Sequence, residues 1–375
     1  MITRRKLVGT AAAFQIMKPE TAFGSQANSK ISVALLGVGG RGTYDARIVH
    51  NDPRARITTR CDRFPDRIEQ GIANLKLENP KTFTDFEKML ASDVDAVVIA
   101  TPPFEHPRML EAAVQARKHV YCEKPAGVDI EGCKRVMAAG KKCDPKKIIS
   151  FGFQQRYGGP YVDTYKRIQA GEIGELVNAR GFWIANDPFV KREYPGVAKD
   201  VEEVRNWFCY RKYSGDFIVE QDCHNIDVLH WYLGGLPLKA VGYAGRKVRT
   251  SMDINDHLTL SFEWPDGMHV NFEANQLTPR GFNRVGEEFT GTKGHAATSR
   301  PRCIITTGVN KSETIEAKRD ITYDAFENFL NMIESGRTEN VAERSALSTM
   351  IALLGRAAMY NPGKEQTWKS VVGSV

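Results

Sequence analysis

The sequence predicts a two-domain α/β protein: a doubly wound parallel sheet, then an α+β domain with an open, mainly antiparallel sheet. A glycine-rich turn at residues 37–42 stands between an apolar run of strand length and a helical segment. Strand and helix patterns then alternate with short loops as far as residue 152. Beyond that point, alternating apolar and polar segments joined by turns take over. The 375 residues suffice for two such domains, which we place at 31–152 and 153–375.

The first predicted strand, residues 31–36 (ISVALL), is apolar throughout, as expected for a strand buried on both faces of a sheet. Alternation of strands and helices with short connections favours a mostly parallel sheet. A nucleotide would then lie across the carboxyl ends of the strands. Further strands are expected at 55–61, 95–100, 119–122 and 148–153, and helices at 43–50, 107–117 and 130–141.

The second half begins with a helix at 160–170 and a strand at 176–184. Strands with a period of two are expected at 240–248, 257–264 and 269–275, and closing helices at 323–334 and 342–360. Pro265-Asp266-Gly267 joins two of the strands as a hairpin turn. An open sheet covered by helices on one face needs cover on the other, so we expect a homo-oligomer, a dimer or a tetramer.

The turn Gly37-Val38-Gly39-Gly40-Arg41-Gly42 is a G-x-G-x-x-G motif. Its glycines permit a tight turn, close approach of the backbone to a pyrophosphate and close helix–strand packing, while the helix N-terminus attracts the phosphates. Asp62 ends the next strand, about twenty residues on, where an acid accepts hydrogen bonds from ribose hydroxyls and repels a 2′-phosphate. Arg63 beside it can stack on adenine or pair with that phosphate. This Rossmann pattern predicts NAD as the cofactor, with NADP as the alternative.

Composition excludes several classes of function. The chain is 42% hydrophobic and 26% charged, which is the balance of a globular protein rather than a disordered one. Its net charge of +7 is partly concentrated in residues 1–30, and the rest is mixed in sign, so no nucleic-acid partner is expected. The sequence contains no run of 18 apolar residues, so no membrane span is expected. The 7 cysteines form no Cys-x-x-Cys pair, which favours separate, mostly buried reduced thiols and no metal site.

The first thirty residues are predicted to be a targeting signal. Arg4 and Arg5 precede a short, weakly apolar stretch, as in a twin-arginine export signal of bacteria, and a frayed basic N-terminus is the alternative. Such export carries folded proteins and predicts a periplasmic location; otherwise the protein is cytoplasmic. An exported protein would meet no soluble NAD pool. We therefore expect tightly held NAD that is regenerated in place.

Further motifs complete the pattern in order: Thr101-Pro102-Pro103-Phe104-Glu105-His106, Glu123-Lys124-Pro125, Gly152-Phe153-Gln154-Gln155-Arg156-Tyr157, Ala170-Gly171-Glu172-Ile173-Gly174, and Glu220-Gln221-Asp222-Cys223-His224-Asn225-Ile226-Asp227. With the glycine turn, they resemble the glucose–fructose oxidoreductase / inositol dehydrogenase (Gfo/Idh/MocA) family over residues 31–360. The resemblance implies an NAD(P)-dependent oxidoreductase that removes a hydride from a hydroxyl carbon of a sugar, cyclitol or glycoside.

Removing a hydride from an alcohol needs a base for the hydroxyl proton, and Lys124 and His224 are the candidates. The resemblance implies that Lys124 contacts the reacting hydroxyl, with a pKa lowered by burial, and a cis peptide bond is expected before Pro125. His224 would share or take the proton. Glu220, four residues earlier, would share a helix face with His224 and orient it or bind a neighbouring hydroxyl.

The remaining assignments are these. Cofactor contacts are expected from Gly37, Gly39, Gly40, Arg41, Gly42, Asp62, Arg63, Thr101, Pro102, His106, Glu123 and Lys124. Substrate contacts are expected from Lys124, Arg156, Tyr157, Trp207, Glu220 and His224, with Trp183 and Tyr210 as further aromatic candidates. Core packing is the alternative for each arginine and aromatic residue in this set. Asp227 is expected to be structural, and no metal is expected because His224, Asp227 and His230 diverge around a helix.

The sequence departs from the family at the predicted active-site helix. The family pattern is Asp-x-Gly-x-His-x-x-Asp, and this chain has Glu220 for the first Asp and Asp222 for Gly. The extra acid–base capacity raises an alternative, a redox-neutral glycosidase in which bound NAD oxidises the sugar transiently. A third hypothesis is a non-catalytic sensor, which the presence of both Lys124 and His224 disfavours.

Overall fold

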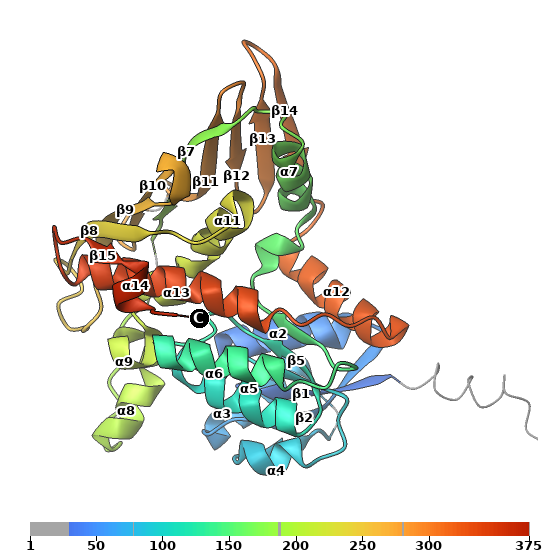
Figure 1. Cartoon of the computed structure of the whole chain (residues 1–375). Helices are drawn as coiled ribbons and strands as arrows, with labels where there is room; N and C mark the ends of the chain where they lie inside the picture. The colour runs from blue at the N-terminus through green and yellow to red at the C-terminus, as the bar shows by residue number, and fades with distance from the viewer. Residues whose placement is uncertain (1–29, 78, 187–188, 280, 375) are drawn as a thin grey trace, which may run out of the picture.

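The computed structural model describes residues 30–77, 79–186, 189–279 and 281–374. They form two sheets, each with helices packed on it, and one long helix lies between the two halves (Figure 1). The predicted export signal lies outside the described residues. Within the described part of the chain, no helix has the length and apolarity to cross a bilayer.

The first sheet has six parallel strands in the order β3-β2-β1-β4-β5-β6. Their bounds are β1 Ile31–Leu36, β2 Ala55–Cys61, β3 Lys81–Phe83, β4 Ala96–Ile99, β5 His119–Cys122 and β6 Ile149–Phe151. The last four residues of β1 are at most 2% exposed, as the continuous apolar run predicts. The strand order reverses between β1 and β4, and that reversal opens a crevice for a ligand at the carboxyl ends of these strands.

Helices cover both faces of this sheet. The helices that share its core are α2 Gly40–Asn51, α3 Pro65–Leu75, α4 Phe86–Leu90, α5 His106–Gln115 and α6 Ile130–Lys141. A late segment, α12 (Ile321–Ser335), joins them. Phe326 stacks on Tyr121 of β5 with ring centroids 4.1 Å apart, and Phe329 meets the same ring edge-on at 5.7 Å. The core of the first sheet therefore includes residues from the far end of the chain.

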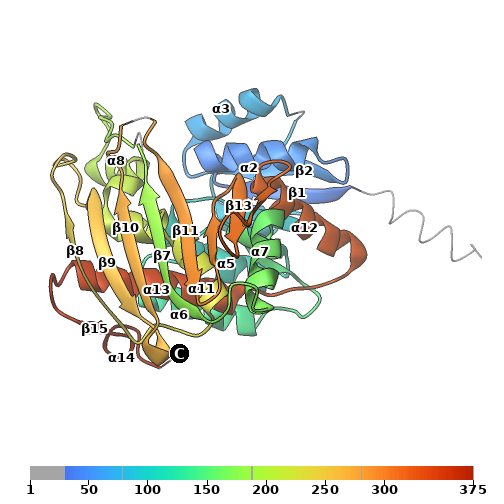
Figure 2. The same cartoon turned by 90° about the horizontal axis from the view of Figure 1, so that it is seen from above.

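The second sheet has nine strands in the order β14-β13-β12-β11-β7-β10-β9-β8-β15. Only the β7–β10 pair is parallel, so the sheet is mainly antiparallel, as predicted. The bounds are β7 Leu176–Ile184, β8 Lys239–Gly245, β9 His257–Glu263, β10 His269–Asn275, β11 Arg284–Gly291, β12 His295–Thr298, β13 Arg302–Thr306, β14 Ser312–Glu316 and β15 Gln366–Thr367. Figure 2 shows α7 (Gly159–Gln169), α11 (Cys223–Leu233) and α13 (Ala342–Met359) along one side of it.

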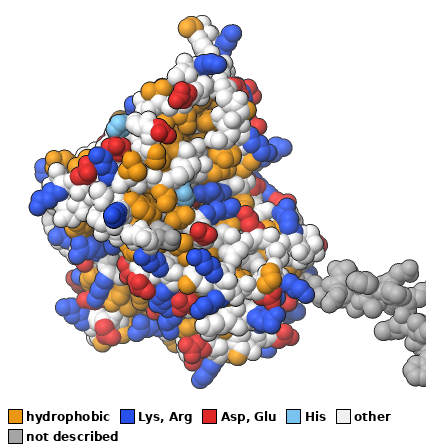
Figure 3. Space-filling model, viewed as in Figure 1, with side chains coloured by type: hydrophobic (Ala, Val, Ile, Leu, Met, Phe, Trp, Pro, Cys, Tyr) orange, Lys and Arg blue, Asp and Glu red, His pale blue; other side chains and the backbone are white. Residues whose placement is uncertain are grey.

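Helix α13 connects the two halves, because it packs on β8 and β9 on one side and on α6 on the other. Short helices complete the structure: α8 Lys199–Arg205, α9 Arg211–Ser214, α10 Phe217–Glu220 and α14 Trp368–Val371. Six of the seven cysteines are buried, Cys143 is half-buried, and all are free thiols, as predicted. Acidic and basic side chains are interspersed across the face in Figure 3.

Candidate active site

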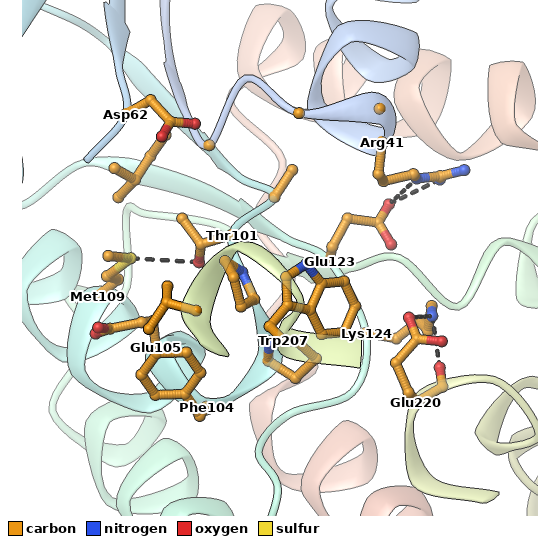
Figure 4. A pocket seen from close by; sticks show the side chains of 18 of the residues that line it. Arg41, Asp62, Thr101, Phe104, Glu105, Met109, Glu123, Lys124, Trp207 and Glu220 are labelled. Carbon is orange, nitrogen blue, oxygen red and sulfur yellow. Dashed lines mark hydrogen bonds and ion pairs between the residues drawn. The ribbon is translucent and has the colours of Figure 1, made fainter. Parts of the chain in front are cut away.

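A cavity of about 570 Å³ lies where the carboxyl ends of β1, β2, β4 and β5 face α10, α11 and β7. One end is lined by the glycine turn and Asp62, and the other by Lys124, Glu220 and His224. Figure 4 shows Arg41 with Glu123 and Lys124 with Glu220 as two pairs along this cavity. The structure therefore brings the predicted cofactor and reaction residues into one site.

The glycine turn has the shape that a pyrophosphate requires. Gly37 has a φ of +89°, and a Cβ there would lie 2.6 Å from the carbonyl oxygen of Ala100. A Cβ on Gly42 would lie 1.9 Å from the carbonyl oxygen of Gly37, so the helix packs directly against the turn. In contrast, Cβ atoms on Gly39 and Gly40 would meet no described atom within 4 Å. Helix α2 begins there without a side-chain cap, which leaves its first N–H groups to receive phosphate oxygens.

Asp62 lies at the end of β2, where the sequence places the ribose-binding acid. Its Oδ2 accepts a hydrogen bond from Val38 N (2.9 Å) and its Oδ1 from Phe64 N (2.9 Å), so the carboxylate also holds the glycine turn in place. Burial raises the pKa of Asp62 above its usual value, and these backbone bonds oppose the shift. Arg63 lines the same end of the cavity. The residues present fit a dinucleotide.

Arg41, in the first turn of α2, lines the cavity. Its Nη2 lies 2.7 Å from Glu123 Oε1, and its Nε lies 3.1 Å from Asp45 Oδ1. Thr101 and Pro102, for which cofactor contacts are predicted, line the cavity, and Thr101 Oγ1 lies 3.3 Å from Met109 Sδ.

His106 lies behind these residues and does not line the cavity. Its ring nitrogens lie 2.7 Å from the Pro125 carbonyl and 2.9 Å from the Thr101 carbonyl. It therefore holds together two loops that line the cavity rather than touching a cofactor.

At the other end, Lys124 Nζ donates to the backbone carbonyl of Glu220 (2.5 Å) and to its Oε1 (2.8 Å). The peptide bond before Pro125 is cis, as predicted. The expected lowering of the Lys124 pKa is wrong. Burial does lower it, but the charge and hydrogen bond of Glu220, with Glu123 nearby, outweigh burial, and the pKa is raised above its ordinary value. Lys124 is thus an ammonium group at neutral pH.

His224 does not share a helix with Glu220, contrary to the sequence prediction. Glu220 ends α10 and His224 lies in the first turn of α11. The Glu220 carbonyl that would receive the His224 N–H in a continuous helix instead accepts from Lys124, and His224 N bonds to Gln221 O. Glu220 therefore holds Lys124 and does not orient the imidazole.

The His224 ring is buried between aromatic rings. It lies nearly parallel to the Trp183 ring, with centroids 6.1 Å apart, and meets Phe153 edge-on at 6.3 Å. Burial, and then the positive charges of Arg300 and Lys124, lower the pKa of His224 well below its usual value, so the ring is neutral. Its Nδ1 is buried with no hydrogen-bond partner among the described residues.

Arg156 and Tyr157 do not line the cavity, contrary to their predicted substrate contacts. Arg156 forms a two-pronged ion pair with Asp227, at 2.8 Å for both Nε–Oδ2 and Nη2–Oδ1, and Asp227 also accepts from Ser348. This pairing explains why Asp227 is structural, as predicted. Tyr157 packs at the edge of the first sheet's core. Trp207 and Trp183 do line the cavity, whereas Tyr210 lies outside it.

Sequence reasoning missed Arg300, which lies in the turn between β12 and β13 and lines the cavity. Its guanidinium carbon lies 5.7 Å from the centre of the Trp183 ring. Gln154 also lines the cavity, from a motif to which no contact role was given. No local pattern marks Arg300, since a single arginine in a hairpin turn is common. Among the described residues, no group of three or more His, Cys, Asp or Glu side chains is arranged to hold a metal.

Comparison with known proteins agrees with this geometry. Residues 31–150 match the oxidoreductase family with an NAD-binding Rossmann fold, and residues 161–297 match the GFO/IDH/MocA C-terminal domain. The scyllo-inositol 2-dehydrogenase (NAD(+)) of Bacillus subtilis (strain 168) is 28% identical over 273 residues, which are 71% of this chain and 72% of that protein. The inositol 2-dehydrogenase of Rhizobium meliloti (strain 1021) is 27% identical over 281 residues, 73% of this chain and 77% of that protein.

Solved structures share the fold. The myo-inositol 2-dehydrogenase from Lactobacillus plantarum superposes with a TM-score of 0.73 at 22% identity, covering 90% of this chain and 99% of that one. A levoglucosan dehydrogenase in complex with NADH and levoglucosan gives 0.76 at 16% identity, with coverage of 90% and 99%. Both halves of the chain thus match one family in order, and the protein belongs to the Gfo/Idh/MocA family of NAD-binding oxidoreductases.

Proposed function

We propose that the protein oxidises a secondary hydroxyl of a carbohydrate or cyclitol with NAD. The observation that carries this proposal is the arrangement of a charged Lys124 and a neutral His224 on one wall of the cavity into which the glycine turn opens. The names of the related inositol dehydrogenases support the substrate class.

Each residue has a task that follows from its charge. The Lys124 ammonium donates a hydrogen bond to the substrate oxygen and stabilises the negative charge that develops there. The neutral His224 takes the hydroxyl proton, because Lys124 is already protonated. Glu220 keeps Lys124 charged and in position. When bound, the nicotinamide supplies the acceptor for the hydride.

The walls of the cavity suit a polyol. Trp183 and Trp207 offer aromatic faces for the apolar face of a sugar or cyclitol ring. The buried Nε1 of Trp183 has no hydrogen-bond partner among the described residues, nor has His224 Nδ1. A ligand rich in hydroxyl groups, or ordered water, would satisfy such atoms.

The test is a screen of purified protein with NAD against sugars, cyclitols and their glycosides, following absorbance of the reduced nicotinamide. Lys124→Met should abolish turnover while nucleotide binding, measured separately by fluorescence, is retained. Lys142→Met removes an exposed lysine and serves as the matched control. Full turnover by Lys124→Met would contradict the proposal. Glycoside cleavage with no net reduction of NAD would favour the redox-neutral glycosidase instead.

Location and cofactor retention form a second part of the proposal. The Arg4-Arg5 pair supports twin-arginine export, and an exported enzyme must keep its nucleotide through every cycle. We expect retention to correspond to a dissociation constant of about nanomolar, or about 12 kcal/mol. After extensive dialysis and denaturation, the released nucleotide should be near-stoichiometric with protein. An empty protein that binds added NAD weakly would refute retention and favour a cytoplasmic location.

A further inference from the structure

The reaction end of the cavity carries a positive charge without a carboxylate partner. Arg300 lines this end and forms no ion pair among the described residues. In the amide orientation that satisfies both of its ends, Gln154 accepts a hydrogen bond from Arg300 Nη2 (3.3 Å) and donates to Gly152 O (2.5 Å). The group that hydrogen-bonds the guanidinium in this orientation is therefore a neutral amide.

The acidic groups around Arg300 are engaged elsewhere. Glu220 pairs with Lys124, Glu123 with Arg41, and Asp227 with Arg156. Asp320 accepts from the Tyr44 hydroxyl (2.6 Å) and from Thr322 N (2.8 Å).

Glu287 is the remaining acid near Arg300. Burial raises its pKa to about 8, so it is largely protonated at neutral pH, and it is bound by Asn225 and Thr298. With His224 neutral as well, Arg300 is a cation at the reaction end of the cavity that no described carboxylate pairs with directly; the charge of Asp320 acts on it only without an ion pair.

An arginine removed from water without a counterion is costly, and it is retained where a ligand supplies the missing charge. Arg300 is half-buried, and its guanidinium faces the indole of Trp183, so its orientation is fixed while part of it still faces the cavity. A planar guanidinium suits a carboxylate, which it binds with two parallel hydrogen bonds. One guanidinium also matches one monoanionic group in charge.

We infer that Arg300 selects substrates that carry a carboxylate, so that the enzyme acts on a uronic acid or its glycoside in preference to the neutral sugar. This inference rests on the proposed function and names the substrate class of that site. The carboxylate would bind Arg300 while a ring hydroxyl lies between Lys124 and His224. Trp183, which contacts both Arg300 and His224, would lie against the ring that joins the two groups.

The test compares sugars that differ only at one carbon. Binding of D-glucuronate and D-galacturonate to the NADH-loaded protein is measured by calorimetry against D-glucose and D-galactose, and catalysis is measured with NAD for the same four compounds. We expect each acid to bind about 100-fold more tightly than its neutral partner, which is about 2.7 kcal/mol. Arg300→Gln should reduce that ratio to near one, and Arg300→Lys should restore part of it because charge returns without the fork.

The controls separate this inference from the proposed function. Arg302→Gln removes an exposed arginine two residues away and should keep the wild-type preference for the acids. Neutral sugars that bind as tightly as the acids, or an Arg300→Gln protein that keeps the preference, would overturn the inference. So would tighter binding of glucose 6-phosphate, or a loss of NADH affinity in Arg300→Gln with uronate binding intact. Preferred binding of uronates without any oxidation would instead overturn the proposed oxidation and leave the role of Arg300 standing.

Discussion

Replacing Glu220 with Gln tests whether this carboxylate keeps Lys124 charged. The two side chains are 12% and 14% exposed, and Nζ lies 2.8 Å from Oε1. At an effective dielectric constant of about 20, unit charges at that separation interact by about 6 kcal/mol. A glutamine in the same place keeps a hydrogen bond to the ammonium worth about 2–3 kcal/mol. The charged form of Lys124 should therefore lose about 3–4 kcal/mol, within the range for breaking a buried ion pair.

The variant should change the pH dependence of stability. In the wild type, the raised pKa of Lys124 stabilises the fold at every pH below its ordinary value of 10.5, and this contribution is lost only as pH rises through the folded value. It is therefore constant between about pH 6 and 9. In Glu220→Gln, burial should bring the pKa of Lys124 below that of the unfolded chain. The folded variant then binds fewer protons than the unfolded one, so its free energy of unfolding should rise with pH.

Two measurements check this reasoning. Urea unfolding of Glu220→Gln at several pH values should give a stability that increases toward alkaline pH relative to wild type. Its kcat/KM should fall over the same range, because the ammonium that stabilises the substrate oxygen is lost. Glu69→Gln removes an exposed glutamate and is the control. Stability and rate profiles of Glu220→Gln that run parallel to the wild type would refute the assignment of Glu220 as the group that holds the charge on Lys124.

Three further outcomes are expected. Gly42→Ala should lower the thermal midpoint because its Cβ would lie 1.9 Å from a backbone oxygen, whereas Gly39→Ala should keep the midpoint and lose nucleotide affinity by titration; equal midpoints would contradict the close packing. Phe326→Ala should cost about 3–5 kcal/mol in urea unfolding, since the ring is fully buried against Tyr121, and a loss under about 1 kcal/mol would show that α12 does not belong to that core. Burial raises the pKa of Glu287 from 4.5 to about 8, so between these pH values the folded chain holds a proton that the unfolded chain releases. The free energy of unfolding of the wild type should therefore fall as pH rises from about 4.5 to about 8. Glu287→Gln should remove this pH dependence, and an unchanged pH dependence would exclude Glu287 as its source.

The features that the sequence predicted well are those encoded locally. The glycine turn is a contiguous motif whose geometry depends on residues a few positions apart, and Asp62 follows at the end of the adjacent strand. Strands such as β1 and β2 were bounded correctly because apolar runs and turn residues delimit them. Lys124 was identified as a candidate because it lies in a short motif at the end of a predicted strand.

The features that were missed depend on contacts between distant segments. Arg156 was expected to contact substrate, but Asp227, 71 positions later, holds its guanidinium in a two-pronged ion pair away from the cavity. The break between Glu220 and His224 follows from a hydrogen bond that Lys124 makes to a backbone carbonyl, 96 positions along the chain. Arg300 reaches the cavity only because a hairpin of the second sheet packs over it. Periodicity and motif spacing contain no information about such encounters.

The position of α12 has a consequence for how the chain is made. The aromatic ring of Tyr121 is fully buried in the core of the first sheet, yet Phe326 and Phe329, which pack against it, leave the ribosome about two hundred residues later. The core of the first sheet therefore lacks the residues of α12 until most of the second sheet has been synthesised. Contacts so distant in sequence are slow to form, and the exposed apolar surface in the interval is open to chaperones. A ribosome-bound fragment that ends before Ile321 should bind a ribosome-associated chaperone and be cleaved readily by protease. Once α12 has emerged, chaperone binding should decrease and protease resistance should increase.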